Sequence, residues 1–374
     1  MRKIKLVHVI TGLNSGGAEV MLYKLLSVMD KNLFDLHVIS MLDEGVFGPK
    51  ITALNIPVYC LNMKKYGLSS LGSLLKYRIL IRKIKPDIVQ GWMPHGNLYA
   101  TLAKLSYFKA KIVFNIRQSL VNYKDKLSTH VIIKLNALFS RWVVAVVNNS
   151  NISQQQHAVI GFSKKNALYI ANGFDVDVFK PDADLYKSVR KFYGLNQQVK
   201  IIGNLARFHP VKNHFGLLEI LQKIHSECAQ PIVFMLGGAG VDSENAELTK
   251  KVRELGLQKN CILLGAVESK SVMPAFDLYI SSSWGEGFPN VIGEAMACGV
   301  PCVTTDVGDC KLIMGGFGGV AAAGDYDSLA KKSILYLDTS ELAKKQIRQH
   351  IIDNYTIGKI AAQYESLYLD VLNK

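Results

Sequence analysis

The chain has 374 residues, 49% of them hydrophobic and 20% charged, which is typical of a globular protein too long for one ordinary core. Its six cysteines are scattered and form no CxxC pair, so we expect neither a disulfide framework nor a zinc site. The N-terminal residues lack the apolar core of a signal peptide, and no run of about twenty apolar residues is present. These features predict a two-domain cytoplasmic protein.

The net charge of +14 is unevenly distributed along the chain. Residues 1–180 contain 24 lysines and arginines against 9 acidic residues, whereas residues 181–374 contain 20 against 21. A basic half of this kind favours an anionic partner such as a phospholipid surface, a phosphorylated acceptor or nucleic acid. A lysine-rich surface that is merely solvated explains the same charge equally well.

The N-terminal part begins with a strand, a glycine-rich turn and a helix, predicted for residues 5–10, 11–17 and 18–29. This order is typical of α/β domains that bind phosphate. The turn has Gly16 and Gly17 at its end in the spacing Gly-x3-Gly-Gly, which differs from the dinucleotide pattern GxGxxG. A tight turn without a ligand is the alternative for these glycines.

Strands alternate with helices through the rest of this half. Five further strands are predicted near residues 35–41, 58–61, 87–90, 111–115 and 142–147. The alternation predicts a parallel sheet with helices on both faces, whose ligands collect at the carboxyl ends of the strands. The Gly16-Gly17 loop, a turn at Met93-Pro94-His95-Gly96, and Arg117 with Gln118 all follow such ends.

A helix predicted for residues 68–84 is both basic and apolar. Leu71, Leu74, Leu75 and Leu80 are expected to pack on the sheet. The side chains expected to face outward are Lys76, Arg78, Arg82 and Lys83. Such a helix is either an ordinary surface helix of the fold or one that lies on an anionic membrane.

The second half repeats the alternation after a crossover around residues 175–200. Its strands are predicted near residues 199–205, 232–236, 262–264, 278–281 and 301–304. A helix over residues 359–372 ends the chain and is expected to cross back onto the first domain. The predicted domains are therefore residues 1–180 with 359–374, and residues 181–358.

Three loops of the second half contain candidate binding residues. Arg207 and Lys212 follow the first strand of this half, where two cations can clamp a diphosphate. Gly238 and Val267 follow the next two strands, where small side chains let a flat base or ribose approach the backbone. Simple turns are an equal alternative for the last two loops.

The most informative stretch is residues 281–301. It predicts a strand end, a glycine-rich loop and a short helix that starts near Pro289 and stops at Gly299. Glu286 lies on the loop and Glu294 on the helix, away from its apolar face. Two carboxylates beside a helix N-terminus indicate a binding site for an anion or for sugar hydroxyls.

Together these motifs resemble glycosyltransferase family 4. The resemblance rests on Gly16-Gly17, Asn172-Gly-Phe-Asp175, Arg207 with Lys212, and Glu286-x7-Glu294, and it extends over nearly the whole chain. It implies an α/β fold of the GT-B type, with two Rossmann-like domains whose parallel sheets face across a cleft. Residues 87–95 and 114–117 are similar to members that extend bacterial surface polysaccharides.

The resemblance also implies a reaction. A sugar would move with retention from a nucleotide sugar, most simply a UDP-sugar, to a glycan acceptor, plausibly linked to a lipid at the inner membrane face. Neither a metal nor a cofactor would be required. Front-side attack, in which the departing phosphate takes the acceptor's proton, would dispense with a catalytic base. Asp175-Val-Asp177 matches the DxD pattern that binds metals, but its place in the crossover argues against that role.

Residue roles follow from the same resemblance. Arg207 and Lys212 would neutralise the diphosphate, Glu286 would bind the donor sugar, and Glu294 would bind the ribose. Gly16 and Gly17 would let the first helix approach the diphosphate. The remaining donor-binding residues would be Gly238, Val267, Gly287, Phe288, Pro289, Asn290, Val291 and Ile292.

Two departures from the family pattern matter. Asn213 follows Lys212 where glycine is usual, and asparagine tolerates the left-handed conformation. Arg117 stands where many members have a histidine, while His95 follows the preceding strand. Either could contact the acceptor or the reacting groups. We favour His95 as the catalytic residue of this half because a neutral imidazole can accept or donate.

Two other functions stay open at this point. An NAD-dependent oxidoreductase would explain the first strand and glycine loop but not the spacing of the glycines. A nucleic-acid-binding protein would explain the basic half, although no clustered aromatic platform for base stacking is evident.

Overall fold

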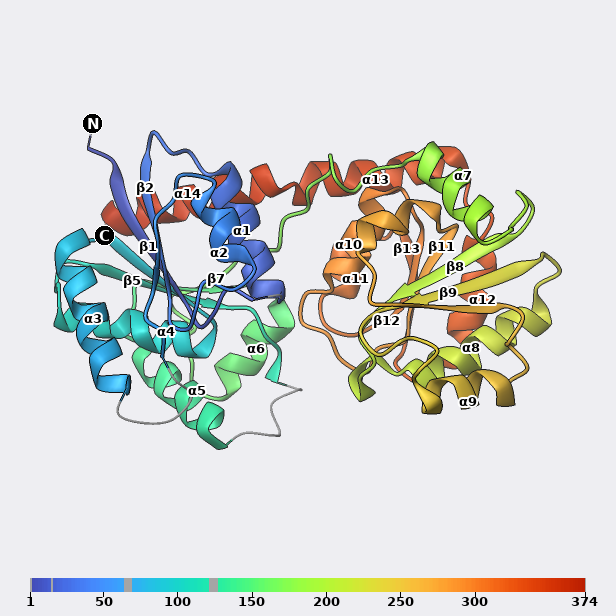
Figure 1. The fold of residues 1–374 in the computed structure, drawn as a ribbon, viewed down its shortest axis with the longest axis horizontal. Coiled ribbons are helices and arrows are strands. Elements are labelled where there is room, and N and C mark those ends of the chain that lie inside the picture. The colour runs from blue at the N-terminus through green and yellow to red at the C-terminus, as the bar shows by residue number, and fades with distance from the viewer. Residues whose placement is uncertain (1, 15, 64–68, 121–126, 374) are drawn as a thin grey trace. The chain divides into compact units, whose positions relative to one another are not determined.

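The computed structural model describes residues 2–14, 16–63, 69–120 and 127–373. The chain forms two compact units (Figure 1). Unit 1 comprises residues 1–173 and 357–374, and unit 2 comprises residues 174–356.

Unit 1 is built on a seven-stranded sheet in the order β3-β2-β1-β4-β5-β6-β7, with every neighbouring pair parallel. The strands are β1 (Ile4–Ile10), β2 (Phe34–Ser40), β3 (Val58–Cys60), β4 (Ile88–Trp92), β5 (Lys111–Ile116), β6 (Ala145–Asn148) and β7 (Ala167–Tyr169). All six strands expected in this half are present. The additional strand β7 has three residues, none of them buried, so its sequence carries little apolar pattern.

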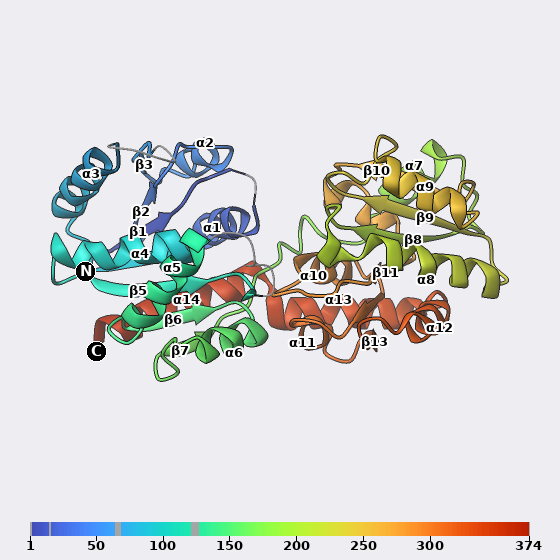
Figure 2. The ribbon, with the colours of Figure 1, turned by 90° about the horizontal axis from the view of Figure 1, so that it is seen from below.

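Helices cover both faces of this sheet. They are α1 (Gly17–Val28), α2 (Phe47–Thr52), α3 (Ser69–Ile84), α4 (Met93–Leu102), the short η1 (Ala103–Leu105), α5 (Leu127–Phe139), α6 (Asn151–Val159) and α14 (Ile357–Asn373). The alternation of the strands puts Val7, Val9 and Phe114 in one core with α3, α4 and α5. The opposite face holds α1 and α14, which contact each other. Figure 2 shows α14 among elements of the N-terminal half.

Only part of the leucine face expected for the helix at residues 68–84 packs on the sheet. Leu80 packs against the core and Leu74 is partly buried, but Leu71 and Leu75 are 67% and 60% exposed. Leu68, the predicted start of the helix, lies outside the described residues. The side of α3 that faces the core instead carries Tyr77, Ile81 and Ile84. Their spacing of three and four residues forms a more continuous apolar stripe than the leucines do, so the helix is rotated relative to the prediction.

Unit 2 is built on a six-stranded parallel sheet in the order β10-β9-β8-β11-β12-β13. Its strands are β8 (Lys200–Leu205), β9 (Ile232–Gly237), β10 (Cys261–Gly265), β11 (Leu278–Ser281), β12 (Cys302–Thr305) and β13 (Gly318–Ala321). Its helices are α7 (Ala183–Phe192), α8 (His214–Glu227), α9 (Ala246–Glu254), α10 (Asn290–Ala297), α11 (Cys310–Met314), α12 (Tyr326–Tyr336) and α13 (Glu341–Tyr355), with short helices η3 (Pro210–Lys212), η4 (Ser269–Ser271) and η5 (Met273–Ala275). The five strands expected here are present, and β13 was missed because it starts with two glycines.

The units meet in the chain at Gly173 and Phe174, seven residues before the expected boundary, and again at Thr356 and Ile357. Phe174 belongs to unit 2 because its ring stacks on Phe288 at a centroid distance of 6.1 Å. A side chain at Gly293 of α10 would collide with the same ring. The Asn172-Gly-Phe-Asp175 motif therefore includes a packing residue of the second unit.

Both sheets have one point where the strand order reverses, between β1 and β4 in unit 1 and between β8 and β11 in unit 2. In open parallel sheets the connections on either side of such a point run in opposite directions and leave a crevice at the carboxyl ends. The residues that follow these four strands are the first place to look for a site.

Candidate functional site

Lys212 and Glu286 form an ion pair at the reversal point of unit 2. The Lys212 Nζ lies 2.5 Å from Glu286 Oε1, and both side chains are largely buried. Ser283 donates its hydroxyl to the same oxygen at 2.7 Å. In the described part of the chain, Glu286 Oε2 has no hydrogen-bond partner, so this oxygen can accept a hydroxyl of a ligand. The sequence had pointed to Lys212 and Glu286 but not to Ser283.

Arg207 lies on the same loop as Lys212 but is exposed. Within the described residues it makes no ion pair or hydrogen bond, so its guanidinium can take up a phosphate. Asn213, between the loop and α8, has φ of 54° and ψ of 49°. The prediction that asparagine would adopt the left-handed conformation in place of glycine is therefore confirmed.

The backbone around Glu286 is held by neighbouring loops. Trp284 donates its N–H to the Val211 carbonyl at 2.8 Å, which ties the loop after β11 to the loop after β8. On the other side, a side chain at Gly308 would lie 2.6 Å from the Glu286 carbonyl oxygen, and φ of Gly308 is +57°. Only glycine allows the loop after β12 to pack this closely. No motif in the sequence singled out Gly308.

The segment from Gly287 to Glu294 continues the site into α10. Phe288 is buried against Phe174, and the helix starts at Asn290 after Pro289, as expected. The first amides of α10, including that of Val291, lie at the N-terminus of the helix, where anions bind. The Ile292 N–H, also expected to bind the donor, donates to the Pro289 carbonyl at 3.2 Å. Glu294 accepts a hydrogen bond from Ser269 at 2.9 Å. Ser269 lies on η4 after β10, so the loop that contains Val267 is fastened to the helix.

Gly238 is in contact with the Arg207 loop. A side chain there would lie 2.2 Å from the Ala206 carbonyl oxygen, and φ of Gly238 is +143°. That carbonyl also accepts the Nε2 hydrogen of the buried His214 at 3.2 Å. Burial lowers the pKa of His214 to about 4, so the ring is neutral and its tautomer is fixed by this bond. His214 thus positions the backbone before Arg207.

In unit 1, Gly16 and Gly17 precede and begin α1 as expected. The Glu19 carboxylate lies directly against Gly16, so a side chain at Gly16 would collide with Glu19 Oε2. Burial raises the pKa of Glu19. A carboxylate therefore lies at the helix N-terminus assigned to a phosphate, which sequence reasoning missed.

His95 lies in the first turn of α4 and not in a turn between elements, as the sequence had suggested. The strand and helix meet without a loop because Met93 has φ of +65°, a strained conformation for a residue with a side chain. Gly91 and Gly96 let α4 pack closely against the backbone of the sheet, since a side chain at Gly96 would collide with the Val9 carbonyl oxygen. Burial lowers the pKa of His95. The half-buried imidazole is therefore neutral at pH 7.

Arg117, after β5, is engaged inside its own unit. Its guanidinium donates to the Tyr364 hydroxyl of α14 at 3.4 Å and also to the Asn172 side chain. It stacks over the Trp92 ring at 5.1 Å. Arg117 therefore ties the C-terminal helix to the sheet, a contact between residues 247 positions apart.

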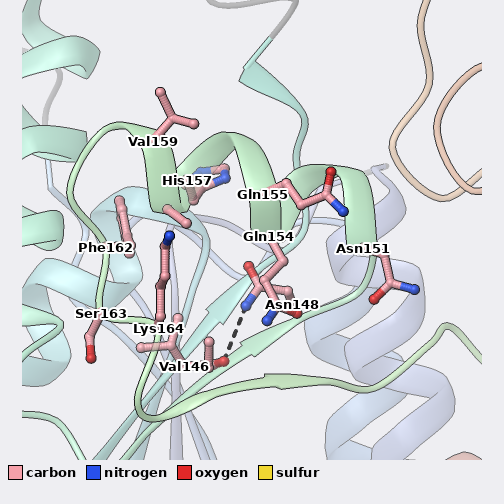
Figure 3. A pocket seen from close by; sticks show the side chains of 12 residues that line it. Val146, Asn148, Asn151, Gln154, Gln155, His157, Val159, Phe162, Ser163 and Lys164 are labelled. Atoms are coloured by element: carbon pink, nitrogen blue, oxygen red, sulfur yellow. Dashed lines mark hydrogen bonds between the residues drawn. The ribbon is translucent and has the colours of Figure 1, made fainter.

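A pocket of about 600 Å³ in unit 1 lies between α6 and the edge of the sheet (Figure 3). Asn148, Gln154 and Lys164 are among its lining residues, and none of the predicted site residues is. The amide of Asn148 is buried and donates to the Val146 carbonyl within the unit.

The Asp175 carboxylate accepts the N–H groups of Asp177 and Val178, each at 3.1 Å, so the DxD motif forms a local turn. Among the described residues, no cluster of three or more acidic, histidine or cysteine side chains suits a metal. Across the same residues, no helix is both long and apolar enough to span a bilayer.

Two family models match the chain. Residues 15–178 match the model described as Glycosyltransferase Family 4, and residues 199–339 match that described as Glycosyl transferases group 1. These ranges contain all the catalytic and binding residues discussed above. The chain belongs to glycosyltransferase family 4. The match favours a glycosyltransferase over the oxidoreductase considered from the sequence.

Relatives agree with this family, and solved structures agree with its fold. The N-acetyl-alpha-D-glucosaminyl L-malate synthase of Bacillus anthracis is 29% identical over 62% of this chain and 60% of its own length. The UDP-Gal:alpha-D-GlcNAc-diphosphoundecaprenol alpha-1,3-galactosyltransferase of Escherichia coli is 24% identical over 100% of this chain and 98% of its own. The crystal structure of Anabaena HepE in complex with UDP has a TM-score of 0.84 at 20% identity, covering 98% and 100% of the two chains. The fold is GT-B, with two Rossmann-like units.

Proposed function

We propose that the protein is a retaining glycosyltransferase that moves a sugar from a UDP-sugar to a polyprenyl-linked glycan in surface polysaccharide synthesis. The observation that carries the proposal is the cluster of Lys212, Glu286 and Ser283 at the reversal point of unit 2, beside Arg207, which forms no ion pair within the described residues. The UDP bound to HepE and the diphosphoundecaprenol acceptor in the name of the E. coli relative support the choice of donor and acceptor.

Different residues of unit 2 bind different parts of the donor. Arg207 and Lys212 hold the diphosphate and offset the charge that develops as the bond between the sugar C1 and the phosphate oxygen breaks. Glu286 Oε2 accepts a hydroxyl of the donor sugar, and Glu294 accepts a ribose hydroxyl. The N-terminus of α10 adds amide donors. Gly238 and Val267 line the space in which the base binds.

Bond formation occurs on the same face of the sugar. The acceptor hydroxyl oxygen bonds to C1 as the phosphate oxygen leaves, and that oxygen takes the hydroxyl proton. UDP departs and the anomeric configuration is kept. His95 of unit 1 acts on the acceptor side as a neutral hydrogen-bonding group. No metal is required in this scheme.

A donor panel tests the proposal. Transfer from several UDP-sugars to a polyprenyl-diphosphate glycan is measured with and without EDTA, and the product anomer is determined by NMR. Retained configuration with EDTA-insensitive rates supports the proposal. Inverted configuration contradicts the mechanism, and loss of activity in EDTA that is restored by a divalent cation contradicts metal independence.

A further inference from the structure

The outer face of the helical layer α3–α4–α5 in unit 1 exposes large apolar side chains in regular stripes. On α3, Leu71, Leu75 and Ile79 follow one another at intervals of four and are 67%, 60% and 56% exposed. Residues at this spacing lie on one side of a helix. The same helix packs into the core through Tyr77 and Ile81, so the stripe points away from the sheet.

A second stripe runs along α5. Val131, Leu135 and Leu138 are 52%, 38% and 48% exposed and share one side of the helix, while Ile133 and Ala137 face the core. Because α3 and α5 pack on the same core, their outer sides belong to one face of the unit.

The two stripes are joined at the amino edge of the sheet. Leu105, Phe108 and Trp142 are 71%, 73% and 69% exposed. They lie shortly before β5 and β6, which pair in parallel, so these segments lie side by side. Leu105 and Trp142 line one apolar hollow of about 410 Å³. Exposed apolar groups gathered in this way mark an interaction surface.

The same face is strongly basic. Lys104, Lys109 and Arg141 are exposed around Leu105, Phe108 and Trp142, and in the described residues none of the three forms an ion pair. Residues 69–173 contain 15 lysines and arginines and only two acidic residues. One of these, Asp87, is bonded to Arg2 at 2.6 Å. The face therefore has little negative charge of its own.

We propose that this face binds the surface of an anionic lipid bilayer, with Leu105, Phe108 and Trp142 inserted among the headgroups. Apolar side chains alternating with lysine and arginine are the pattern of interfacial membrane binding. Tryptophan favours that interface, and each cation near an anionic surface adds to the attraction. Lysines are depleted in protein–protein interfaces, which makes a protein partner a poorer fit. The proposal is independent of the donor and acceptor assigned above.

Vesicle sedimentation of the full chain tests the surface. We expect binding to vesicles that contain phosphatidylglycerol and at least tenfold weaker binding to pure phosphatidylcholine. The triple variant Leu105→Ser, Phe108→Ser, Trp142→Ser should bind at least tenfold more weakly, as should Lys104→Glu, Lys109→Glu, Arg141→Glu. Matched controls in unit 2 are Phe192→Ser, Leu335→Ser, Leu342→Ser, which are 80%, 75% and 68% exposed, and the charge reversals of exposed Lys191, Lys259 and Lys331. Both controls should bind like the parent.

Tryptophan fluorescence locates the contact even if a triple variant folds poorly. The chain has three tryptophans, of which Trp92 is buried and Trp284 lies in unit 2. Brominated anionic lipid should quench the protein, Trp142→Phe should abolish the quenching, and Trp284→Phe should keep it. Equal binding to neutral vesicles, unchanged quenching in Trp142→Phe, or self-association through this face without vesicle binding would overturn the proposal.

Discussion

The carboxyl edges of the two sheets differ in how their charged groups are arranged. In unit 2, Lys212 and Ser283 converge on one oxygen of Glu286, and the other oxygen and Arg207 are available to a ligand. In unit 1, Arg117 is already bonded to Tyr364 and Asn172. The charged groups of unit 2 thus leave a carboxylate oxygen and a guanidinium for a ligand, whereas Arg117 of unit 1 is engaged in contacts within its own unit.

The largest effect is expected from Lys212. Lys212→Ala should lower kcat/KM for transfer by about 100- to 1,000-fold, because a charge that stabilises the leaving diphosphate is lost. Steady-state kinetics measures this. The control is Lys251→Ala, since Lys251 pairs with Glu219 at 2.9 Å and its side chain is 26% exposed, as that of Lys212 is. Equal activity of Lys212→Ala and Lys251→Ala would contradict a special role of the Lys212–Glu286 ion pair in transfer.

Replacing Arg117 should affect the stability of unit 1 and not transfer directly. Arg117→Met is expected to destabilise unit 1 by about 2 kcal/mol, because two hydrogen bonds of a partly buried charged group are lost. Denaturation in a Trp142→Phe, Trp284→Phe background reports on Trp92, which touches Arg117. Arg253→Met, at an exposed position of α9, should be neutral. A stable Arg117→Met protein with weakened acceptor binding would instead make Arg117 a ligand-binding residue.

Much of this contrast could be predicted from the sequence, and the features that could not be predicted were missed for physical reasons. The positions of most strands, Lys212, Glu286 and the ends of α10 follow from local patterns, because β-branched runs, glycines and prolines act on their own neighbourhood. Ser283, Gly308 and the bonds of Arg117 depend on residues far away in the chain, which one sequence without a structure does not connect. The rotation of α3 was missed because leucines at 71 and 75 fit a helical period as well as Tyr77 and Ile81 do.

Each unit should also lose stability in mild acid, most strongly through His8 in unit 1 and His214 in unit 2. Burial lowers the pKa of His8 in unit 1 to about 3 and that of His214 in unit 2 to about 4. Below pH 6.5 the unfolded chain binds a proton that the folded ring does not, so stability falls with pH until the folded pKa is reached. From pH 6.5 to 5 the loss is about 2 kcal/mol per histidine.

Chemical denaturation at several pH values measures this loss. His8→Gln and His214→Gln should each flatten the profile, and the doubly substituted chain should be flattest. His225→Gln, on the exposed side of α8, serves as the control. A parent profile that is level between pH 6.5 and 5 would contradict the burial argument.

The smallest effect is expected at Ser283. Ser283→Ala removes one hydrogen bond to Glu286 and should reduce kcat/KM about tenfold, since Lys212 still holds the carboxylate. Ser271→Ala is the control, because its hydroxyl bonds the Glu268 carbonyl just before η4 and not a carboxylate. A loss as large as that of Lys212→Ala would give Ser283 a direct role on the donor.

Hydrogen exchange with and without a UDP-sugar tests the difference between the two edges most directly. We predict slower exchange on donor binding in residues 206–213 and 283–294 of unit 2, and loss of that protection in Lys212→Ala but not in Lys251→Ala. Protection confined to unit 1, or none in these two segments of unit 2, would contradict the assignment of the donor site.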